Sequence, residues 1–143
     1  MDERGKREQQ RHEIRTKTDN RMETGLTYAA TLTVDNAHSA IAMGSGDMPV
    51  LATPAMVALM ENAAMMAVAS HLPEGATTVG GQISTSHLRP SAMDAVVTAT
   101  ATLEKVEGKK LFFRVEARQG ETLIGEGTHL RFIVDREKFM VKL

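Results

Sequence analysis

The sequence has no cysteine and no tryptophan, and aromatic residues make up only 3% of its 143 positions. Without cysteine the chain has no disulfide framework, no thiolate nucleophile and no cysteine-ligated metal, which suits a reducing, cytoplasmic environment. The scarcity of aromatic rings removes the stacking surfaces that single-stranded nucleic acid needs. It also predicts a core built from Ala, Val, Leu and Met side chains.

Neither sign of charge dominates, because 17 Lys and Arg stand against 18 Asp and Glu, for a net charge of -1. Such a domain has no positive field to attract a phosphate backbone, so we expect no nucleic-acid partner. The longest strongly apolar stretch, Val50 to Val68, is interrupted by Glu61 and Asn62, and no apolar segment follows the N-terminus. We therefore expect neither export nor a membrane span.

The length fits one domain, since domains average roughly 150 residues. The charges are unevenly spread, with thirteen of the thirty-five charged side chains in residues 1–23. A segment of that composition buries too little apolar surface to offset its ordering entropy. The sequence therefore predicts a charged leader over residues 1–22, either disordered or a frayed helix, and one domain over residues 23–143. We expect the leader to contribute nothing to a functional site.

The domain begins with a strand and continues into one long helix. Leu26 to Val34 alternates apolar and polar side chains, which is typical of a strand. Asp35 to Asp47 is rich in Asn, Ser, Gly and Asp, which predicts a loop or a loose helical turn. Thr53 and Pro54 are typical of a helix start, and the helix formers after them predict a helix from Pro54 to Ser70.

Four strand-like segments joined by short turns follow the helix, and short turns favour antiparallel pairing. They run over Thr77 to Leu88, Ala95 to Val106, Lys110 to Arg118 and Thr122 to Val134. Each alternates apolar and polar side chains, so each is expected to bury one face. The economical arrangement is an α+β hotdog fold, in which an antiparallel sheet of about five strands wraps around one long central helix.

Glu61 conflicts with the helix around it. Nearly every side chain between Ala52 and Val68 is apolar, which predicts a helix buried on almost all sides. An ionised carboxylate buried without a partner costs on the order of several kcal/mol, so Glu61 is expected to be paired, hydrogen-bonded or protonated, as groups at functional sites are. The alternative is that Glu61 and Asn62 form a narrow stripe facing solvent or a second subunit.

His87 is the strongest candidate among the five histidines. Alternation puts Ile83, Thr85 and His87 on one side of a strand that Pro90 ends. A histidine there is either a hydrogen-bonded structural residue or a general base. His129 is either a surface residue or a neighbour of the site. The remaining histidines, which are weaker candidates, are His12, His38 and His71. No two histidines are three or four residues apart, so we expect no metal site.

Three segments taken together resemble a known family: Thr53 to Glu61, Val79 to His87 and Gly125 to Arg131. From Gly25 to Phe139, in order and without large gaps, the chain resembles the fluoroacetyl-CoA thioesterase-like branch of the hotdog-fold thioesterases. The resemblance implies hydrolysis of an acyl-CoA thioester, with coenzyme A present only as part of the substrate and no other cofactor.

The resemblance also implies which residues act. A threonine at the head of the helix, a glutamate two turns on and a histidine at the end of the next strand form the family's catalytic set, and they match Thr53, Glu61 and His87. The backbone amide that contacts the thioester carbonyl matches Gly80, and Arg131 is implied as a second substrate-binding residue. A glycine at the first of these two positions allows close approach of the substrate to the main chain.

One departure from the family concerns selectivity. The fluoroacetyl-specific member carries phenylalanines in the loop ahead of the helix, which gate the acyl pocket, and the matching residues here are Gly44 and Asp47. A gate without rings excludes water less well. We therefore expect a general short-chain or another acyl-CoA substrate rather than fluoroacetyl-CoA alone.

The residue types permit several routes. Either Glu61 attacks the thioester carbonyl to form a mixed anhydride, or Glu61 or His87 deprotonates water, with Thr53 positioning the reacting group. Eight helical residues separate Thr53 and Glu61 by roughly 12 Å along the axis, beyond hydrogen-bond reach. Part of the site must then bend in or come from a second chain. Hotdog proteins usually dimerise through their sheets, so we expect a homodimer or a dimer of dimers with composite sites.

Two other functions fit the same fold. The hotdog carrier-protein dehydratases place a histidine fourteen residues before the helix glutamate, and this sequence has Asp47 there. A non-catalytic acyl-CoA binding module is the other alternative, because a fold does not imply an activity. Such a module would gain nothing from a buried carboxylate, so the combination of Thr53, Glu61 and His87 favours hydrolysis.

Overall fold

The computed structural model describes residues 22–143, so the predicted leader lies outside the described residues except for Met22. Each predicted strand and the predicted long helix are present, with every boundary within one residue of its expected place. In chain order the elements are β1 (Thr27–Thr33), η1 (Asn36–His38), α2 (Ala40–Met43), α3 (Thr53–Ala69), β2 (Ala76–His87), β3 (Val96–Glu107), β4 (Lys110–Gln119), β5 (Thr122–Asp135) and α4 (Arg136–Val141).

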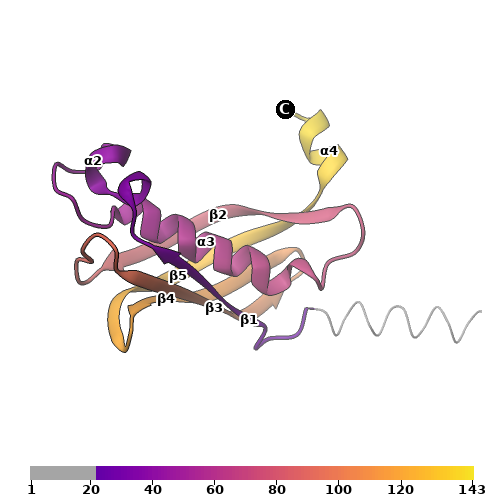
Figure 1. The fold of residues 1–143 in the computed structure, drawn as a ribbon. Helices are drawn as coiled ribbons and strands as arrows, with labels where there is room; N and C mark the ends of the chain where they lie inside the picture. Colours follow the sequence, from indigo (N-terminus) through magenta and orange to yellow (C-terminus); the bar gives the residue numbers. More distant parts are fainter. Residues whose placement is uncertain (1–21) are drawn as a thin grey trace, which may run out of the picture.

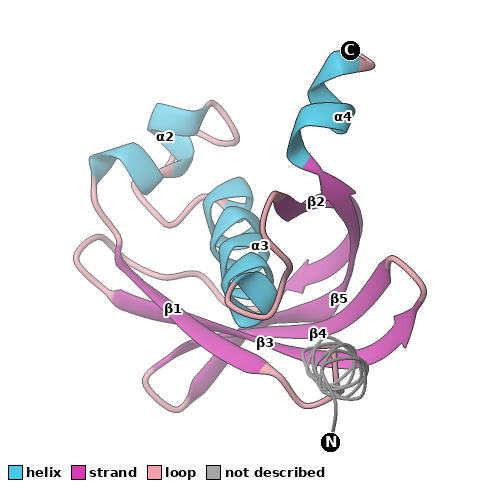
Figure 2. Cartoon of the chain, turned by 90° about the vertical axis from the view of Figure 1, so that its right-hand side faces the viewer, coloured by secondary structure: helices cyan, strands magenta, loops and turns pink. Residues whose placement is uncertain are grey.

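The five strands form one antiparallel sheet in the order β1-β3-β4-β5-β2. The sheet curls around α3, which lies along its concave face, while α2 and α4 lie at opposite ends of the molecule (Figures 1 and 2). This arrangement is the hotdog fold that the order of elements predicts. The two edge strands are β1 and β2, and in the described part of the chain the outer edge of each is unpaired.

Alternation along the central strands explains the core. In β3 and β4 every second side chain faces α3 and is almost fully buried, as expected for half-buried strands. These side chains are Val97, Ala99, Ala101, Leu103, Leu111, Phe113, Val115 and Ala117. They pack against the alanines and methionines of one half of α3, which confirms a core built with few aromatic rings.

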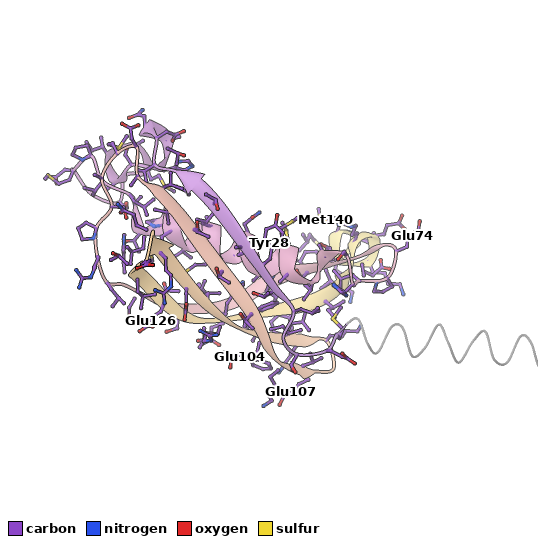
Figure 3. The ribbon with its side chains drawn as sticks, turned by 60° about the horizontal axis from the view of Figure 1, so that its bottom comes forward. Tyr28, Glu74, Glu104, Glu107, Glu126 and Met140 are labelled. Atoms are coloured by element: carbon purple, nitrogen blue, oxygen red, sulfur yellow. The ribbon has the colours of Figure 1, made fainter. Side chains whose placement is uncertain are left out.

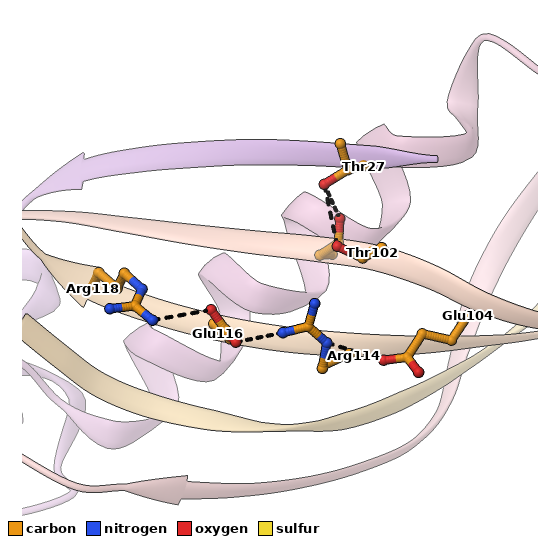
Figure 4. A network of polar contacts seen from close by, with 7 residues as sticks. Thr27, Thr102, Glu104, Arg114, Glu116 and Arg118 are labelled. Atoms are coloured by element: carbon orange, nitrogen blue, oxygen red, sulfur yellow. Dashed lines mark hydrogen bonds and ion pairs between the residues drawn. The ribbon is translucent and has the colours of Figure 1, made fainter. Parts of the chain in front are cut away.

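The convex face of the sheet is polar. Arg114 lies between two carboxylates there, with its Nε 3.1 Å from Oε1 of Glu104 and its Nη1 bonded to Glu116, which also pairs with Arg118 (Figure 4). Glu104, Glu107 and Glu126 project away from the helix on this side (Figure 3). The side chains of this network are largely exposed, so each pair contributes little to stability. This charged network therefore lies on the side of the sheet opposite α3.

Short helices lie before α3 and after β5. The segment Asp35 to Asp47, predicted as a loop or a loose helical turn, contains η1 and α2. The sequence analysis did not anticipate α4, which begins where the Asp135 side chain accepts a hydrogen bond from the Lys138 amide. That aspartate is a typical helix start. Among residues 22–143, no helix is both long and apolar enough to span a membrane.

Candidate functional site

Thr53 and His87 meet at the head of the central helix. Thr53 is the first residue of α3 and His87 is the last residue of β2, and Thr53 Oγ1 lies 2.8 Å from His87 Nδ1. The two side chains line a pocket of about 420 Å³, together with residues from the loop after α2 and from Leu88 to Pro90. The structure therefore brings two of the three predicted catalytic side chains into direct contact.

The surroundings of His87 favour its neutral form. Burial lowers the pKa of His87, and a hydrogen bond with the backbone of Arg89 only partly opposes this effect. Its Nε2 atom is buried and has no hydrogen-bond partner in the described part of the chain. A neutral imidazole in contact with a hydroxyl can accept a proton, which is the property that a general base requires.

Glu61 lies in a second group of side chains, two turns further along α3. A Cβ built on Gly80 of β2 would lie 3.3 Å from Glu61 Oε2 and 3.5 Å from Arg131 Nη1. Because Gly80 has no side chain, a space remains beside it that is bordered by the Glu61 carboxylate, the Arg131 guanidinium and the main chain of β2. Glu61 and Gly80 line a pocket of about 410 Å³ with Gly81, Gln82, Ile83 and His129.

A β-bulge puts both groups on the same face of β2. Gly80 pairs with Arg131 and Gln82 pairs with Leu130, so Gly81 is an extra residue without a partner on β5. Before the bulge the even-numbered residue Thr78 is buried, and after it the odd-numbered residues up to His87 are the more buried ones. Without the extra residue, strict alternation would turn His87 away from the face that Gly80 occupies.

Gly81 is the residue that this bulge requires. A Cβ at that position would lie 2.2 Å from Cε2 of Phe132, so any side chain would displace that ring. The adjacent glycines Gly80 and Gly81 were the available sequence signal, because glycine inside a strand often marks a bulge or a close approach. The alternation from Ile83 to His87 was correctly predicted, whereas the bulge was not.

Arg131 and His129 form a buried polar network behind Gly80. Arg131 is 6% exposed, and it donates from Nε to Thr78 Oγ1 at 2.8 Å and from Nη2 to the Thr78 carbonyl at 2.9 Å. His129 is 3% exposed, so the surface alternative for it is wrong and it is a neighbour of the site. Burial lowers the pKa of Arg131, and the nearby Glu61 carboxylate opposes this effect.

The two groups are separate within one chain. Their pockets share no lining residue, and Thr53 and Glu61 stand eight residues apart on α3, which corresponds to roughly 12 Å of helix. The prediction that α3 is buried on almost all sides is wrong for the single chain. One face is open to solvent, and the exposed or half-buried residues along it include Val57, Ala58, Glu61, Asn62, Met65 and Met66.

This open face explains how Glu61 tolerates its helix. Its carboxylate is neither fully buried nor hydrogen-bonded within residues 22–143, because the side chain borders the pocket at Gly80. Glu61 and Asn62 therefore lie on an open stripe of the helix, which was the alternative prediction for these two residues. Its neighbours are mostly apolar, however, and Met66 is 39% exposed. A contiguous apolar stripe is more typical of an interface than of a solvated surface.

The loop positions that bear on selectivity also fall near the first pocket. Asp47 lines the pocket of Thr53 and His87, so a carboxylate and no ring stands at that wall. Gly44 ends α2 with a φ of 73°, in the left-handed region that favours glycine. Neither residue supplies an aromatic gate.

Comparisons with known proteins agree with the fold and with the family that the sequence resembles. The family model described as "FlK: Fluoroacetyl-CoA-specific thioesterase" matches residues 34–137. A fluoroacetyl-CoA thioesterase from Streptantibioticus cattleyicolor is 42% identical over 94 residues, which cover 66% of this chain and 68% of that protein. Residues 34–137 include the long helix and the strands that carry both groups of side chains.

Solved structures give the same picture. A structure of the fluoroacetyl-CoA thioesterase FlK superimposes with a TM-score of 0.79 at 33% identity, covering 85% of this chain and 94% of that chain. A thioesterase superfamily member from Thermus thermophilus has a TM-score of 0.79 at 28% identity, covering 85% and 90%. Because the family model matches well over half of the chain, this protein belongs to the family of the fluoroacetyl-CoA-specific thioesterase FlK.

Proposed function

We propose that this thioester hydrolase cleaves a small acyl-CoA at two composite sites of a homodimer, and that each site combines Thr53 and His87 of one protomer with Glu61 and Gly80 of the other. Family membership gives the reaction class, acyl-CoA thioester hydrolysis. The observation that carries the proposal is the contact between the Thr53 hydroxyl and the His87 imidazole, 2.8 Å apart, while Glu61 occupies a separate pocket.

Two features support a dimer through β2. This strand is twelve residues long and its outer edge is unpaired in residues 22–143, and an exposed edge of that length readily pairs with another strand. Because Gly81 is an extra residue, Gly80 and His87 are six pairing positions apart on it, so an antiparallel pairing of β2 with its own copy, centred on Ser84, puts Gly80 of one chain opposite His87 of the other. The twofold axis then produces two equivalent sites.

The open face of α3 fits the same arrangement. Val57, Ala58, Met65 and Met66 lie beside Glu61 along this face, and burial of their apolar surface against a second chain would stabilise the dimer at roughly 25 cal/mol per Å². In a single chain this surface is left exposed to water. A second copy of the chain therefore both completes the site and covers the apolar stripe.

The chemistry follows from the groups in each composite site. Neutral His87, in contact with the Thr53 hydroxyl, accepts the proton of the attacking water while the C–O bond forms. The carbonyl oxygen becomes an oxyanion, which the Gly80 amide is placed to stabilise, an interaction typically worth about 3 kcal/mol. The C–S bond then breaks, the proton passes to the coenzyme A thiolate, and the products are the carboxylic acid and free coenzyme A.

Glu61 and Arg131 complete the polar lining. We assign Glu61 to orient and polarise the attacking water across from His87, because its Oε2 atom faces the space at Gly80. We assign Arg131 to binding of the acyl end of the substrate, since its Nη1 atom faces the same space.

The acyl group is expected to be short and not selectively fluorinated. The pocket wall carries Asp47 and the preceding loop carries Gly44, so no phenylalanine at these two positions closes over the acyl group. A site that excludes water poorly discriminates weakly between similar short chains, because one methylene is worth only about 1–3 kcal/mol.

A panel of acyl-CoA thioesters tests this proposal. Free coenzyme A released from acetyl-, fluoroacetyl-, propionyl-, butyryl- and long-chain acyl-CoA is measured with a thiol reagent. We expect acetyl-CoA and fluoroacetyl-CoA, whose acyl groups have the same number of carbons, to be hydrolysed with kcat/KM values within about tenfold of each other. A preference of several orders of magnitude for fluoroacetyl-CoA would refute the selectivity argument. Tight binding of all members without thiol release would identify a binding module instead.

A further inference from the structure

His129 makes two hydrogen bonds that together fix its protonation. Its Nδ1 atom lies 2.7 Å from the carbonyl oxygen of Gln82, and its Nε2 atom lies 3.2 Å from Nη1 of Arg131. The imidazole is 3% exposed, and its ring packs near that of Phe113, with the centroids 6.3 Å apart. His129 is therefore an almost fully buried titratable group to which the proposed reaction assigns no step.

The partners determine the tautomer. A carbonyl oxygen only accepts hydrogen bonds, so Nδ1 must carry the proton and donate it to Gln82. A guanidinium only donates, so Nε2 must be unprotonated and accept from Arg131. Burial lowers the pKa of His129 and the Arg131 charge lowers it further, while the Gln82 carbonyl and the Glu61 carboxylate oppose these effects. Both nitrogens are therefore already engaged in the neutral ring, and neither can exchange a proton with a substrate.

The hydrogen bond from Arg131 to His129 fixes the position of Nη1, the guanidinium nitrogen that faces the site. Nε and Nη2 are held by the hydroxyl and the carbonyl of Thr78, on the side away from Gly80. Nη1 is the atom that would lie 3.5 Å from a Cβ on Gly80, near the Glu61 carboxylate, and His129 is its only hydrogen-bond partner among residues 22–143.

We propose that His129 is a positioning residue: as a permanently neutral imidazole protonated on Nδ1, it aims Nη1 of Arg131 at the acyl site beside Gly80 and Glu61. The inference rests on the proposed function, in which that space holds the acyl end of the substrate. His129 acts on the reaction through Arg131 and takes no part in proton transfer. The bulge at Gly81 contributes as well, because it sets the position of the Gln82 carbonyl that orients the ring.

Two amide substitutions separate the bonds of His129. Glutamine can present its side-chain oxygen where Nε2 stood and so keep an acceptor for Arg131, whereas asparagine reaches only the Nδ1 position. We expect His129→Asn to raise KM for the best acyl-CoA about tenfold with kcat within about threefold, and His129→Gln to stay within about threefold of the wild type in both. Melting temperatures are recorded for both variants, and His71→Gln is the matched control, because His71 is half-buried and lines neither pocket.

A double-mutant cycle shows whether the effect passes through Arg131. In an Arg131→Met background the further change His129→Asn is expected to alter KM by less than about twofold, because the arm that it positions is gone. Equal losses in His129→Asn and His129→Gln would overturn the proposal. So would a full tenfold effect of His129→Asn in the Arg131→Met background, because it would show a role independent of the guanidinium.

A spectroscopic measurement decides the tautomer without any turnover. In long-range ¹H–¹⁵N correlation spectra of the whole protein, Nδ1 of His129 is expected to be protonated and Nε2 unprotonated throughout the pH range in which a free imidazole titrates. A ring that is protonated on Nε2, or that becomes cationic in that range, would contradict the inference. If the wild type released no thiol from any acyl-CoA, the proposed function would fail, and this spectrum would still test the state of His129.

Discussion

Replacement of Glu61 by glutamine is expected to lower kcat at least about a hundredfold while the fold survives. Glutamine keeps the shape of the side chain and removes its charge, so water at the thioester carbonyl loses the carboxylate that orients it. Glu61 makes no hydrogen bond within the described residues, and its carboxylate lies near the buried guanidinium of Arg131. The melting temperature should therefore fall only modestly, because no hydrogen bond is lost but the buried Arg131 loses a nearby negative charge.

The measurement is thiol release at saturating substrate, with the melting temperature recorded on the same preparation. Glu74→Gln is the matched control, because Glu74 is an exposed glutamate in the turn before β2 (Figure 3) and lines neither pocket. This control should leave kcat unchanged. If purified Glu61→Gln enzyme hydrolyses its best acyl-CoA at a near wild-type rate, Glu61 has no role as nucleophile, base or water-orienting group.

Removal of the His87 imidazole is expected to have a similarly large effect. His87→Ala should lower kcat about a hundredfold or more, because general-base catalysis by a positioned side chain contributes roughly 10²–10⁴-fold.

The pH dependence of the wild-type activity tests the same role of His87. Since burial lowers the pKa of His87, the wild type should keep its neutral base, and its activity, to more acidic pH than an ordinary histidine would allow.

Substitutions of Thr53, the hydrogen-bond partner of His87, test the same pair of residues. Thr53→Ala should lower kcat less, by about tenfold, because the hydroxyl positions the imidazole and does not take the proton. Thr53→Ser keeps the hydroxyl and should retain most of the activity. An acid limb in the pH profile that is the same in the wild type and in His87→Ala would show that another group is the base.

The sequence was sufficient to predict the fold because its signals are local. Alternation predicts each strand, Thr53 and Pro54 mark the start of α3, and the short turns favour antiparallel pairing. The missed helix α4 lies just after the last predicted strand, where Asp135 is a helix start that alternation alone does not register. The strand boundaries were predicted accurately because the alternation of apolar and polar side chains ends where a turn begins.

The site was only partly predictable because it depends on contacts between distant residues. The hydrogen bond between Thr53 and His87 joins positions 34 residues apart, and the type of each residue does not reveal it. The bulge at Gly81 changes which residues of β2 face the helix, so a prediction from strict alternation fails across it. The burial of His129 follows from its pairing with Arg131, a relation that no single-residue preference encodes.

The central claim, that each site is shared between two chains, is tested most directly by mixed dimers. Glu61→Gln and His87→Ala chains are co-expressed with different tags, and the heterodimer is purified. If the sites are composite, one site of the heterodimer receives both changes and the other receives neither, so the heterodimer should show about half the wild-type activity while both parent homodimers are nearly inactive. If each chain builds its site alone, no site of the heterodimer is intact and its activity would be as low as that of the parents, which would contradict the account.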